Sequence, residues 1–374
     1  MKKMLRWLGS GRRSLPAPAP PSAQPPSPRP RKKLINLALQ GGGAHGAFTW
    51  GVLDHLLADG RLQFEGISGT SAGAVNAILL ADGLARGGPQ EARKRLADFW
   101  KAASVGGSLP ALQRAVIERL FAFLPLDESP MQMWFNALSR YFSPYTLNPL
   151  NINPLKTLIE RFVDFDAVRA CENLQLFISA TNVHTGRLRV FSRDKITADV
   201  VMASACLPFL FQAVEIDGVP YWDGGYLGNP AIFPFFHTTA TEDVLIVQLN
   251  PLERKSTPTT SHEIVNRINE ITFNSSLLSE YRAIEFVARL IQQQRLPHGT
   301  GPGQYRLIKL HRIVLDGSGR VYSADTKLSN DYEFFELMRT RGEQSARHFL
   351  DAHFDDINVR STVDLIAEAH AEWA

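Results

Sequence analysis

The sequence FEGISGTSAG at residues 64–73 decides the fold. It carries an apolar segment into a Gly-x-Ser-x-Gly motif, and a helix of small residues, predicted over 74–85, follows without a break. The order strand, sharp turn, helix is typical of a nucleophile elbow, which lifts a serine hydroxyl above a sheet. Gly69 and Gly73 leave room for such a turn. Ser71 is therefore the candidate nucleophile.

The same turn supplies a candidate oxyanion donor. The backbone N–H of Ala72 stands at the start of the new helix, where it can face a negative charge. Ser68 is a second serine in the stretch, but Thr70 would occupy the position at which an elbow needs a small residue. The motif alone is also compatible with an ordinary strand-to-helix turn, so the rest of the chain has to decide.

Charge is concentrated at the start of the chain. Residues 1–33 carry nine Lys or Arg and no acid, which leaves 31 basic and 37 acidic residues in the remainder. The body is thus mildly acidic, and nucleic-acid binding by it is not expected. Eight prolines between Pro16 and Pro30 predict a disordered arm with the character of a polyproline-II spacer.

The arm offers two interpretations. It can be a solvated linker, or it can touch anionic lipid and bring the protein to a membrane surface. Its apolar part is too short for a secretory signal, and no apolar run in the chain approaches the roughly 18 residues of a membrane span. We therefore expect a cytoplasmic or peripheral membrane protein.

A second strand–loop–helix unit precedes the elbow. Residues 34–39 form a short apolar strand, QGGGAHG follows at 40–46, and a helical pattern covers 47–57. Two such units in succession predict a mostly parallel sheet with helices on both faces, an α/β/α sandwich. Further strands are expected at 174–180, 188–191, 214–216, 219–222, 244–249 and 305–314, and helices at 198–206, 262–294, 331–352 and 362–372.

A helical stripe of large apolar residues lies at 131–142, within a mostly helical stretch. Core packing is the usual meaning of such a stripe. Because the opposite side carries Met133 and Tyr141, a lid or lipid-entrance surface is the alternative.

The glycine loop and the elbow should lie side by side, since both follow parallel strands. Gly41, Gly42 and Gly43 can direct several backbone N–H groups to one spot, which favours an anion. Asp223, after a hairpin with an Asp217-Gly218 turn, is followed by two glycines and could approach Ser71 as its base. The three elements together predict a serine hydrolase.

Two other chemistries share these residues. Gly41, Gly43 and Gly46 also satisfy a dinucleotide-binding pattern with Glu65 downstream, although Glu65 precedes the end of the strand. A Ser-His-Asp triad is the second alternative, with His298 or His311 in the histidine position.

Three motifs in order resemble the signatures of patatin-like phospholipases. They are QGGGAHG at 40–46, GTSAG at 69–73 and DGG at 223–225, with supporting matches at Ala203-Ser204-Ala205 and Asn229-Pro230. The resemblance spans about residues 34–236 and implies a catalytic core there, behind the arm 1–33. Residues 237–374 would complete the sheet and add helices.

The resemblance implies a Ser-Asp dyad, with Ser71 as nucleophile and Asp223 as base, acting on phospholipids or other acyl lipids. It implies an oxyanion hole of backbone amides from the glycine loop, which comprises Gly41, Gly42, Gly43 and Ala44. The other motif glycines are Gly46, Gly69, Gly73, Gly224 and Gly225. A catalytically silent lipid-binding or scaffold protein on the same fold is the non-enzymatic alternative.

Two departures and one absence complete the expectations. His45 stands where the family usually has Lys or Arg, which makes it a candidate pH-sensitive contact. Asn182 stands where an Asp is common. No metal or other cofactor is expected, because Cys171 and Cys206 are far apart and no His/Asp/Glu cluster has ligand spacing.

Overall fold

The centre of the molecule is a parallel sheet built around strand β1 (Lys33–Leu39). Strand β2 (Leu62–Gly69) lies on one side of β1, and β7 (Asp243–Gln248) followed by β8 (Lys309–Val314) lies on the other, all parallel. The computed structural model describes residues 32–104, 143–208, 210–315, 326–327 and 329–370. Residues 32–374 belong to one compact unit. Thus β7 and β8, which lie beyond residue 237, join the same sheet as the motif-bearing strands.

The other end of the sheet is antiparallel, and its register brings two strand ends together. Strand β3 (Gln175–Asn182) pairs with β4 (Arg187–Ser192) along residues 177–182. Parallel β2 pairs with 175–178 of β3, and antiparallel β6 (Val219–Asp223) pairs with 180–182. Because β4 occupies one edge of β3, β2 and β6 must share the other. The last residues of β2 and β6 therefore meet head to head.

The remaining elements are helices and one short strand. The larger helices are α1 (Gly46–Asp59), α2 (Ala72–Ala103), α10 (Ser261–Gln292) and α11 (Tyr332–His353). The smaller ones are α5 (Pro144–Leu147), α6 (Pro154–Phe162), α7 (Phe165–Ala170), α8 (Ala198–Ser204), α9 (Phe235–Thr238) and α12 (Leu365–His370). Strand β5 (Val214–Ile216) pairs with β6, and three 3₁₀ turns occupy η1 (Gly43–His45), η2 (Arg193–Lys195) and η3 (Gly224–Tyr226).

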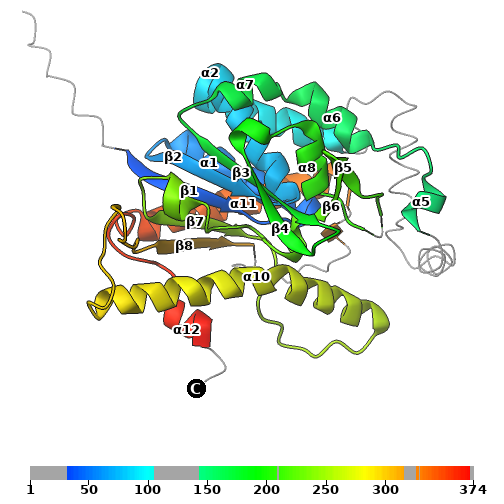
Figure 1. The fold of residues 1–374 in the computed structure, drawn as a ribbon. Coiled ribbons are helices and arrows are strands. Elements are labelled where there is room, and N and C mark those ends of the chain that lie inside the picture. The colour runs from blue at the N-terminus through cyan, green and yellow to red at the C-terminus, as the bar shows by residue number, and fades with distance from the viewer. Residues whose placement is uncertain (1–31, 105–142, 209, 316–325, 328, 371–374) are drawn as a thin grey trace, which may run out of the picture. The chain divides into compact units, whose positions relative to one another are not determined.

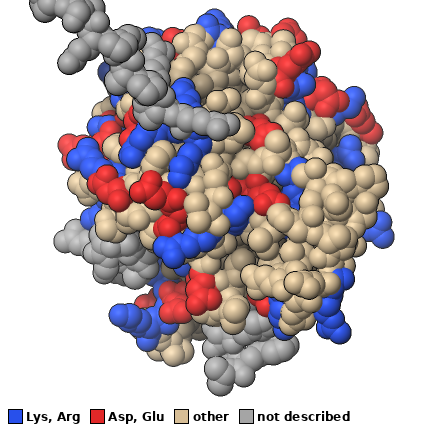
Figure 2. Space-filling model, turned by 90° about the vertical axis from the view of Figure 1, so that its left-hand side faces the viewer, with Lys and Arg blue, Asp and Glu red and all other residues tan. Residues whose placement is uncertain are grey.

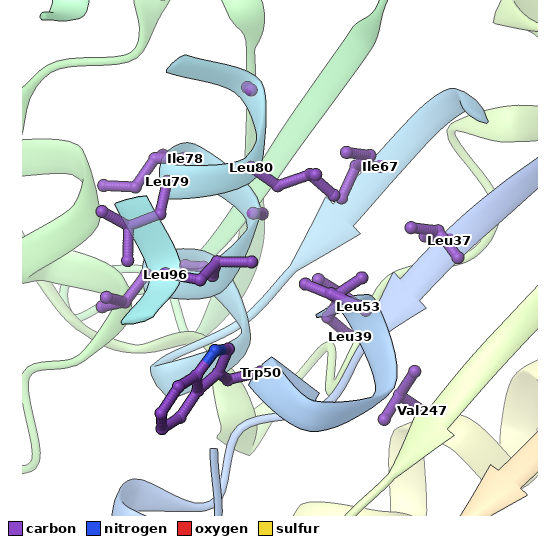
Figure 3. Close-up of a cluster of buried hydrophobic side chains, with 14 of the residues drawn as sticks. Leu37, Leu39, Trp50, Leu53, Ile67, Ile78, Leu79, Leu80, Leu96 and Val247 are labelled. Atoms are coloured by element: carbon purple, nitrogen blue, oxygen red, sulfur yellow. The ribbon is translucent and has the colours of Figure 1, made fainter. Parts of the chain in front are cut away.

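Helices cover both faces of the sheet. Helices α1, α2 and α11 pack on one face, and α10 and α12 on the other (Figure 1). The strands serve both cores by alternation: Leu245 and Val247 of β7 belong to the α1/α2 core, whereas Val244 and Ile246 belong to the α10 core. Figure 3 shows Leu53 of α1 next to Leu39 of β1, and Leu80 of α2 extending toward Ile67 of β2, in the larger core. The predicted three-layer α/β/α sandwich is confirmed.

Local sequence explains where several helices begin. Thr260 Oγ1 accepts the Glu263 N–H at 3.2 Å while Glu263 Oε2 accepts the Thr260 N–H at 3.1 Å, a capping box that opens α10. Asn153 caps α6 ahead of a proline, and Asp331 caps α11. These side chains satisfy backbone donors that would otherwise be left unpaired at the helix starts.

The structure differs from the sequence-based expectations in two places. Helix α2 runs to Ala103 rather than ending near residue 85, and it is kinked at Gly88, whose φ of 73° precedes Pro89. The strand expected at 305–314 begins at Lys309. The arm 1–31 and the apolar stripe at 131–142 lie outside the described residues. The Asp217-Gly218 turn is as predicted, with φ of 51° and 76°.

The side of the molecule at which β1 begins carries mixed charge. Figure 2 shows Lys and Arg interspersed with Asp and Glu on this side, and neither sign forms a continuous patch there. Ion pairs such as Lys309–Glu242 (3.1 Å) and Arg61–Asp59 (2.8 Å) account for part of this pattern. In the described part of the chain, no helix is long and apolar enough to cross a membrane.

Candidate active site

Ser71 lies in a sharp turn between β2 and α2. Its backbone has φ 55° and ψ −123°, a left-handed-side conformation that is strained for a residue with a side chain. The Gly73 N–H donates to the Thr70 carbonyl at 2.8 Å, which closes the turn. A Cβ at Gly69 would lie 2.6 Å from the Gly73 carbonyl oxygen, so the turn requires glycine at this position. The geometry is that of the predicted elbow.

Ser204 holds the backbone of the elbow. Its fully buried hydroxyl, at the end of α8, accepts the Ser71 N–H at 3.0 Å. The sequence motif around Ser204 carried no sign of this role, because the two serines are 133 positions apart. Without Ser204 a partly buried amide would lack an acceptor, so this hydrogen bond helps to fix the strained turn.

Asp223 is fully buried and rigidly held at the end of β6. Its Oδ1 accepts the Gly225 N–H at 2.7 Å, its backbone N–H donates to the Cys206 carbonyl at 2.8 Å, and its own carbonyl accepts Thr181 Oγ1 at 2.8 Å. Its second oxygen, Oδ2, has no hydrogen-bond partner among the described residues. One acceptor of the carboxylate is thus available to another group.

Burial raises the pKa of Asp223 from 3.8 to about 7, against the opposing effects of the Gly225 N–H and the Ser71 hydroxyl. The head-to-head ends of β2 and β6 bring the Ser71 turn to this carboxyl group, and the Ser71 hydroxyl favours its charged form. Burial first, and the Asp223 charge second, raise the pKa of the Cys206 thiol to about 12, so this cysteine stays protonated.

The glycine loop packs directly against Ser71. A Cβ at Gly41 would lie 2.7 Å from the Ser71 Cβ. The Gly41 N–H, however, donates to Asn229 Oδ1 at 2.7 Å, so this amide is occupied and does not qualify as an oxyanion donor. Four other backbone amides at the loop and elbow have no hydrogen-bond partner within the described ranges, namely those of Gly42, Gly43, Ala44 and Ala72.

The loop is supported by a buried polar hub. Gln40 Oε1 accepts the N–H groups of Leu249 and Asn250, each at 2.9 Å, and its Nε2 donates to the Asn229 carbonyl at 3.2 Å and Asn274 Oδ1 at 3.1 Å. These bonds join the ends of β1 and β7 to helix α10. The remaining motif glycines, Gly46, Gly224 and Gly225, each lie where an added Cβ would come within 3.0 Å of a neighbouring atom.

His45 is not the pH-sensitive contact that its position suggested. It is buried, with Nε2 at 2.7 Å from Thr326 Oγ1. Burial, followed by the charges of Lys327 and Arg254, lowers its pKa to about 3. The imidazole is therefore neutral throughout the physiological range. Asn182, the other departure, caps a turn by accepting the Thr185 N–H at 3.0 Å.

The histidines of the triad alternative lie at the opposite edge of the sheet. His311 Nε2 is 2.9 Å from Asp243 Oδ1, and Asp243 is the first residue of β7, whereas Ser71 follows the last residue of parallel β2. His298 Nε2 is 2.8 Å from Glu242 Oε1 beside the same strand start. A cavity of about 490 Å³ lies at that edge, lined in part by these groups. Neither histidine is placed to serve Ser71.

The dinucleotide alternative also fails on geometry. Glu65 was its acidic residue for a ribose, but the carboxylate accepts the N–H groups of Ala240 (2.6 Å) and Thr241 (2.8 Å). Glu65 thereby anchors the loop before β7. It lies within β2 and not at the carboxyl end of that strand, where a ribose-binding acid would stand. No hydroxyl-binding role is left for it.

Known proteins were compared with the chain by sequence and by structure. No curated protein sequence matches it. Among solved structures, VipD from Legionella pneumophila is 16% identical, with a TM-score of 0.43 and coverage of 85% of this chain and 67% of VipD. The type III effector protein ExoU is 16% identical, with a TM-score of 0.33 and coverage of 87% of this chain. The chain spans 54% of the length of ExoU.

The family comparison is more specific. The family model described as patatin-like phospholipase matches residues 37–236. That match covers more than half of the chain and includes the glycine loop, the elbow at Ser71 and the Asp223 motif. The chain therefore belongs to the patatin-like phospholipase family.

Proposed function

We propose that the protein is a lipid acyl hydrolase that cleaves carboxylic esters through a Ser71 acyl-enzyme, with Asp223 as the base. Family membership implies lipid ester hydrolysis. The observation that carries the finer proposal is that a strained, half-buried serine and a buried carboxylate lie at strand ends that meet. The Oδ2 atom of that carboxylate has no hydrogen-bond partner in the described structure. The lipid would be a phospholipid or another acyl lipid.

In the first half-reaction Ser71 Oγ attacks the ester carbonyl carbon as its proton passes to Asp223 Oδ2. A carboxyl group with a pKa of about 7 is ionised in about half of the molecules at neutral pH, and it is a far stronger base than an ordinary aspartate. This raised basicity lets Asp223 do what a histidine does in a triad. The free amides of Gly42, Gly43, Ala44 and Ala72 are the proposed donors to the oxyanion.

The tetrahedral intermediate then collapses. The bond between the carbonyl carbon and the leaving oxygen breaks, and the proton on Asp223 passes to that oxygen, which leaves as the alcohol. In the second half-reaction Asp223 takes a proton from water as the water oxygen attacks the acyl carbon. Collapse returns the proton to Ser71 Oγ and releases the fatty acid. The cycle needs no group beyond these residues and water.

The proposal is tested by an acyl-ester panel, from short p-nitrophenyl esters to phospholipid and triacylglycerol vesicles. Wild-type protein should hydrolyse lipid esters, Ser71→Ala should not, and Asp223→Asn should fold yet lose at least a hundredfold in kcat, given the 10²–10⁴-fold that a positioned base contributes. Full activity of Ser71→Ala would refute the nucleophile. Near-wild-type turnover of Asp223→Asn would refute the base while sparing the nucleophile.

A scaffold protein on the same fold is distinguished by labelling. A fluorophosphonate should modify the folded wild type and leave Ser71→Ala unlabelled. A folded wild type that resists the label and hydrolyses nothing in the panel would favour the scaffold. Activity confined to short soluble esters would instead count against a lipid substrate.

A further inference from the structure

The edge of the sheet that holds Ser71 continues toward β7. Ser71, Gly41 and Asn250 each stand two residues beyond the end of a strand, and their strands β2, β1 and β7 are adjacent and parallel. Gly41 packs on the Ser71 Cβ on one side, while its carbonyl accepts Asn250 Nδ2 at 2.8 Å on the other. Strands about 4.8 Å apart place Asn250 roughly 10 Å from Ser71.

Lys327 completes this line across the edge. Its Nζ donates to Asn250 Oδ1 at 2.6 Å, and its carbonyl oxygen lies so close to Gly43 that a Cβ there would be 2.2 Å away. The preceding residue, Thr326, contacts His45 as described above. Two consecutive residues from the C-terminal part of the chain thus lie against the glycine loop, and they bring an ammonium group with them.

Within the described ranges, this ammonium is not paired with an acid. Asn250 is a neutral acceptor, and no carboxylate lies within 4.0 Å of Lys327 Nζ among the described residues. The nearest acid in electrostatic effect is Glu270, which is buried and already paired with Arg254 and Arg267. Lys327 therefore brings a positive charge to a loop whose backbone N–H groups also favour an anion.

The charges of Lys327 and Arg254 act on the glycine loop, as the pKa of His45 shows. Burial is the main cause of the lowered pKa of His45, and the charges of Lys327 and Arg254 add to it. Lys327 is half-buried, and burial lowers the pKa of its ammonium group from 10.5 to about 8, so the group still carries its proton in most molecules at neutral pH. A partly desolvated cation with a neutral partner forms strong charge-assisted hydrogen bonds with phosphate oxygens.

We propose that Lys327 forms a subsite for the phosphate of a glycerophospholipid whose acyl ester lies at Ser71, an inference that rests on the proposed function. The glycerol backbone separates the ester carbonyl from the phosphate by a few bonds. That span, together with a hydrogen bond to the ammonium, matches the roughly 10 Å between Ser71 and Asn250. A neutral acylglycerol offers no anion to this subsite, so the enzyme should prefer the phosphate-bearing lipid.

The test compares two substrates that differ only in the phosphate: 1-lauroyl-lysophosphatidic acid and 1-monolauroylglycerol, each in neutral detergent micelles. The ratio of their kcat/KM values should fall about 10- to 100-fold in Lys327→Gln, as loss of a charged hydrogen bond implies. Lys327→Arg should keep most of the ratio. Lys101→Gln, which changes the net charge equally at an exposed site on α2, should leave it as in wild type.

Three results would overturn the subsite. The first is a ratio in Lys327→Gln within twofold of wild type, which would assign the lysine a merely structural role. The second is a wild type with no preference for the phosphate-bearing ester, which decides the matter even if the glutamine variant fails to fold. The third is an effect of inorganic phosphate on turnover of the neutral ester that requires Lys327, without competition between inorganic phosphate and the lysophosphatidic acid. That result would mean that Lys327 binds free phosphate and not the phosphate of the lipid.

A binding measurement separates this inference from the catalytic proposal. Glycerol 3-phosphate, titrated by calorimetry into Ser71→Ala, should bind at least tenfold more tightly than into Ser71→Ala combined with Lys327→Gln. Such binding, together with a wild-type protein that hydrolyses no ester, would support the subsite and refute the proposed activity. Hydrolysis that depends on Ser71, with equal binding by the two proteins, would do the reverse.

Discussion

Replacing the buried carboxyl group of Asp223 by an amide should stabilise the protein at neutral and alkaline pH. Asp223 is 0% exposed, and burial raises its pKa from 3.8 to about 7 even though the Gly225 N–H and the Ser71 hydroxyl favour the charged form. Asparagine has the same shape, carries no charge, and its Oδ1 can still accept the Gly225 N–H. The change therefore removes a charge that folding has to desolvate.

The size of the effect follows from the pKa. A rise of about three units corresponds to about 4 kcal/mol at roughly 1.4 kcal/mol per unit. We therefore expect Asp223→Asn to raise the free energy of unfolding by about 2–4 kcal/mol at pH 8. With an unfolding entropy of about 2.1 cal/mol/K per residue, that corresponds to about 3–6 °C in Tm.

The stability difference between Asp223→Asn and wild type should depend on pH. Between pH 4 and pH 7 the unfolded chain has lost the Asp223 proton while the folded chain keeps it, so wild-type stability from this group falls as pH rises through that window. Below pH 4 the carboxyl group is neutral in both states, and the two proteins should differ little. Above pH 7 the difference should be constant.

Thermal and urea unfolding at pH 4.5, 6 and 8 measure this difference. Asp217→Asn is the matched control, because Asp217 is exposed and its φ of 51° suits asparagine. Its stability difference from wild type should not change over the same range. An Asp223→Asn protein that is less stable than wild type at pH 8, or a gap that is independent of pH, would refute the raised pKa and with it the basicity on which the dyad depends.

Three further outcomes are expected. With Asp223 as base, kcat/KM for a short ester should rise about tenfold from pH 6 to pH 8, whereas an aspartate of ordinary pKa would give a flat profile there. Ser204→Ala leaves the Ser71 N–H without its acceptor, so we expect about 1–3 kcal/mol lost by urea unfolding and a larger fall in kcat than rise in KM. Gly43→Ala should lower Tm far more than Gly60→Ala: both have positive φ, 58° and 72°, but only at Gly43 would the Cβ meet another chain segment, at 2.2 Å.

The strand–loop–helix units and their motifs could be predicted because their signals are local. The apolar strand before the elbow, the two glycines around Ser71 and the Asp217-Gly218 turn are all readable within ten residues. The head-to-head meeting of β2 and β6 explains why two motifs 152 positions apart form one site, and that meeting depends on the register of β3, which no local pattern encodes. The order of the motifs predicted that Ser71 and Asp223 act together, and the register of the sheet explains why they meet.

The contacts that hold the site could not be predicted in the same way. Ser204, Gln40 and Asn229 act through single hydrogen bonds between distant segments, and a buried polar residue gives no sign in sequence of which amide it will satisfy. The Gly41 amide shows the consequence. The glycine loop suggested it as an oxyanion donor, but in the fold it donates to Asn229 Oδ1. The prediction that His45 is a pH-sensitive contact was wrong for a related reason. The pKa of His45 is set by burial and by charges from residues more than 200 positions away.

The part of the chain beyond the family match bears on the choice of lipid substrate. The family match ends at residue 236, yet Asn250 and Lys327 lie beyond it and contact the glycine loop within it. The chemistry of the dyad depends on backbone geometry inside the matched region, which tolerates little change. The groups that we propose as substrate contacts, roughly 10 Å from Ser71, come from outside that region. Head-group preference in this family member should therefore follow the residues around β7 and Lys327 rather than the signature motifs, and exchanging them should alter the choice of lipid while the hydrolysis of a short neutral ester is retained.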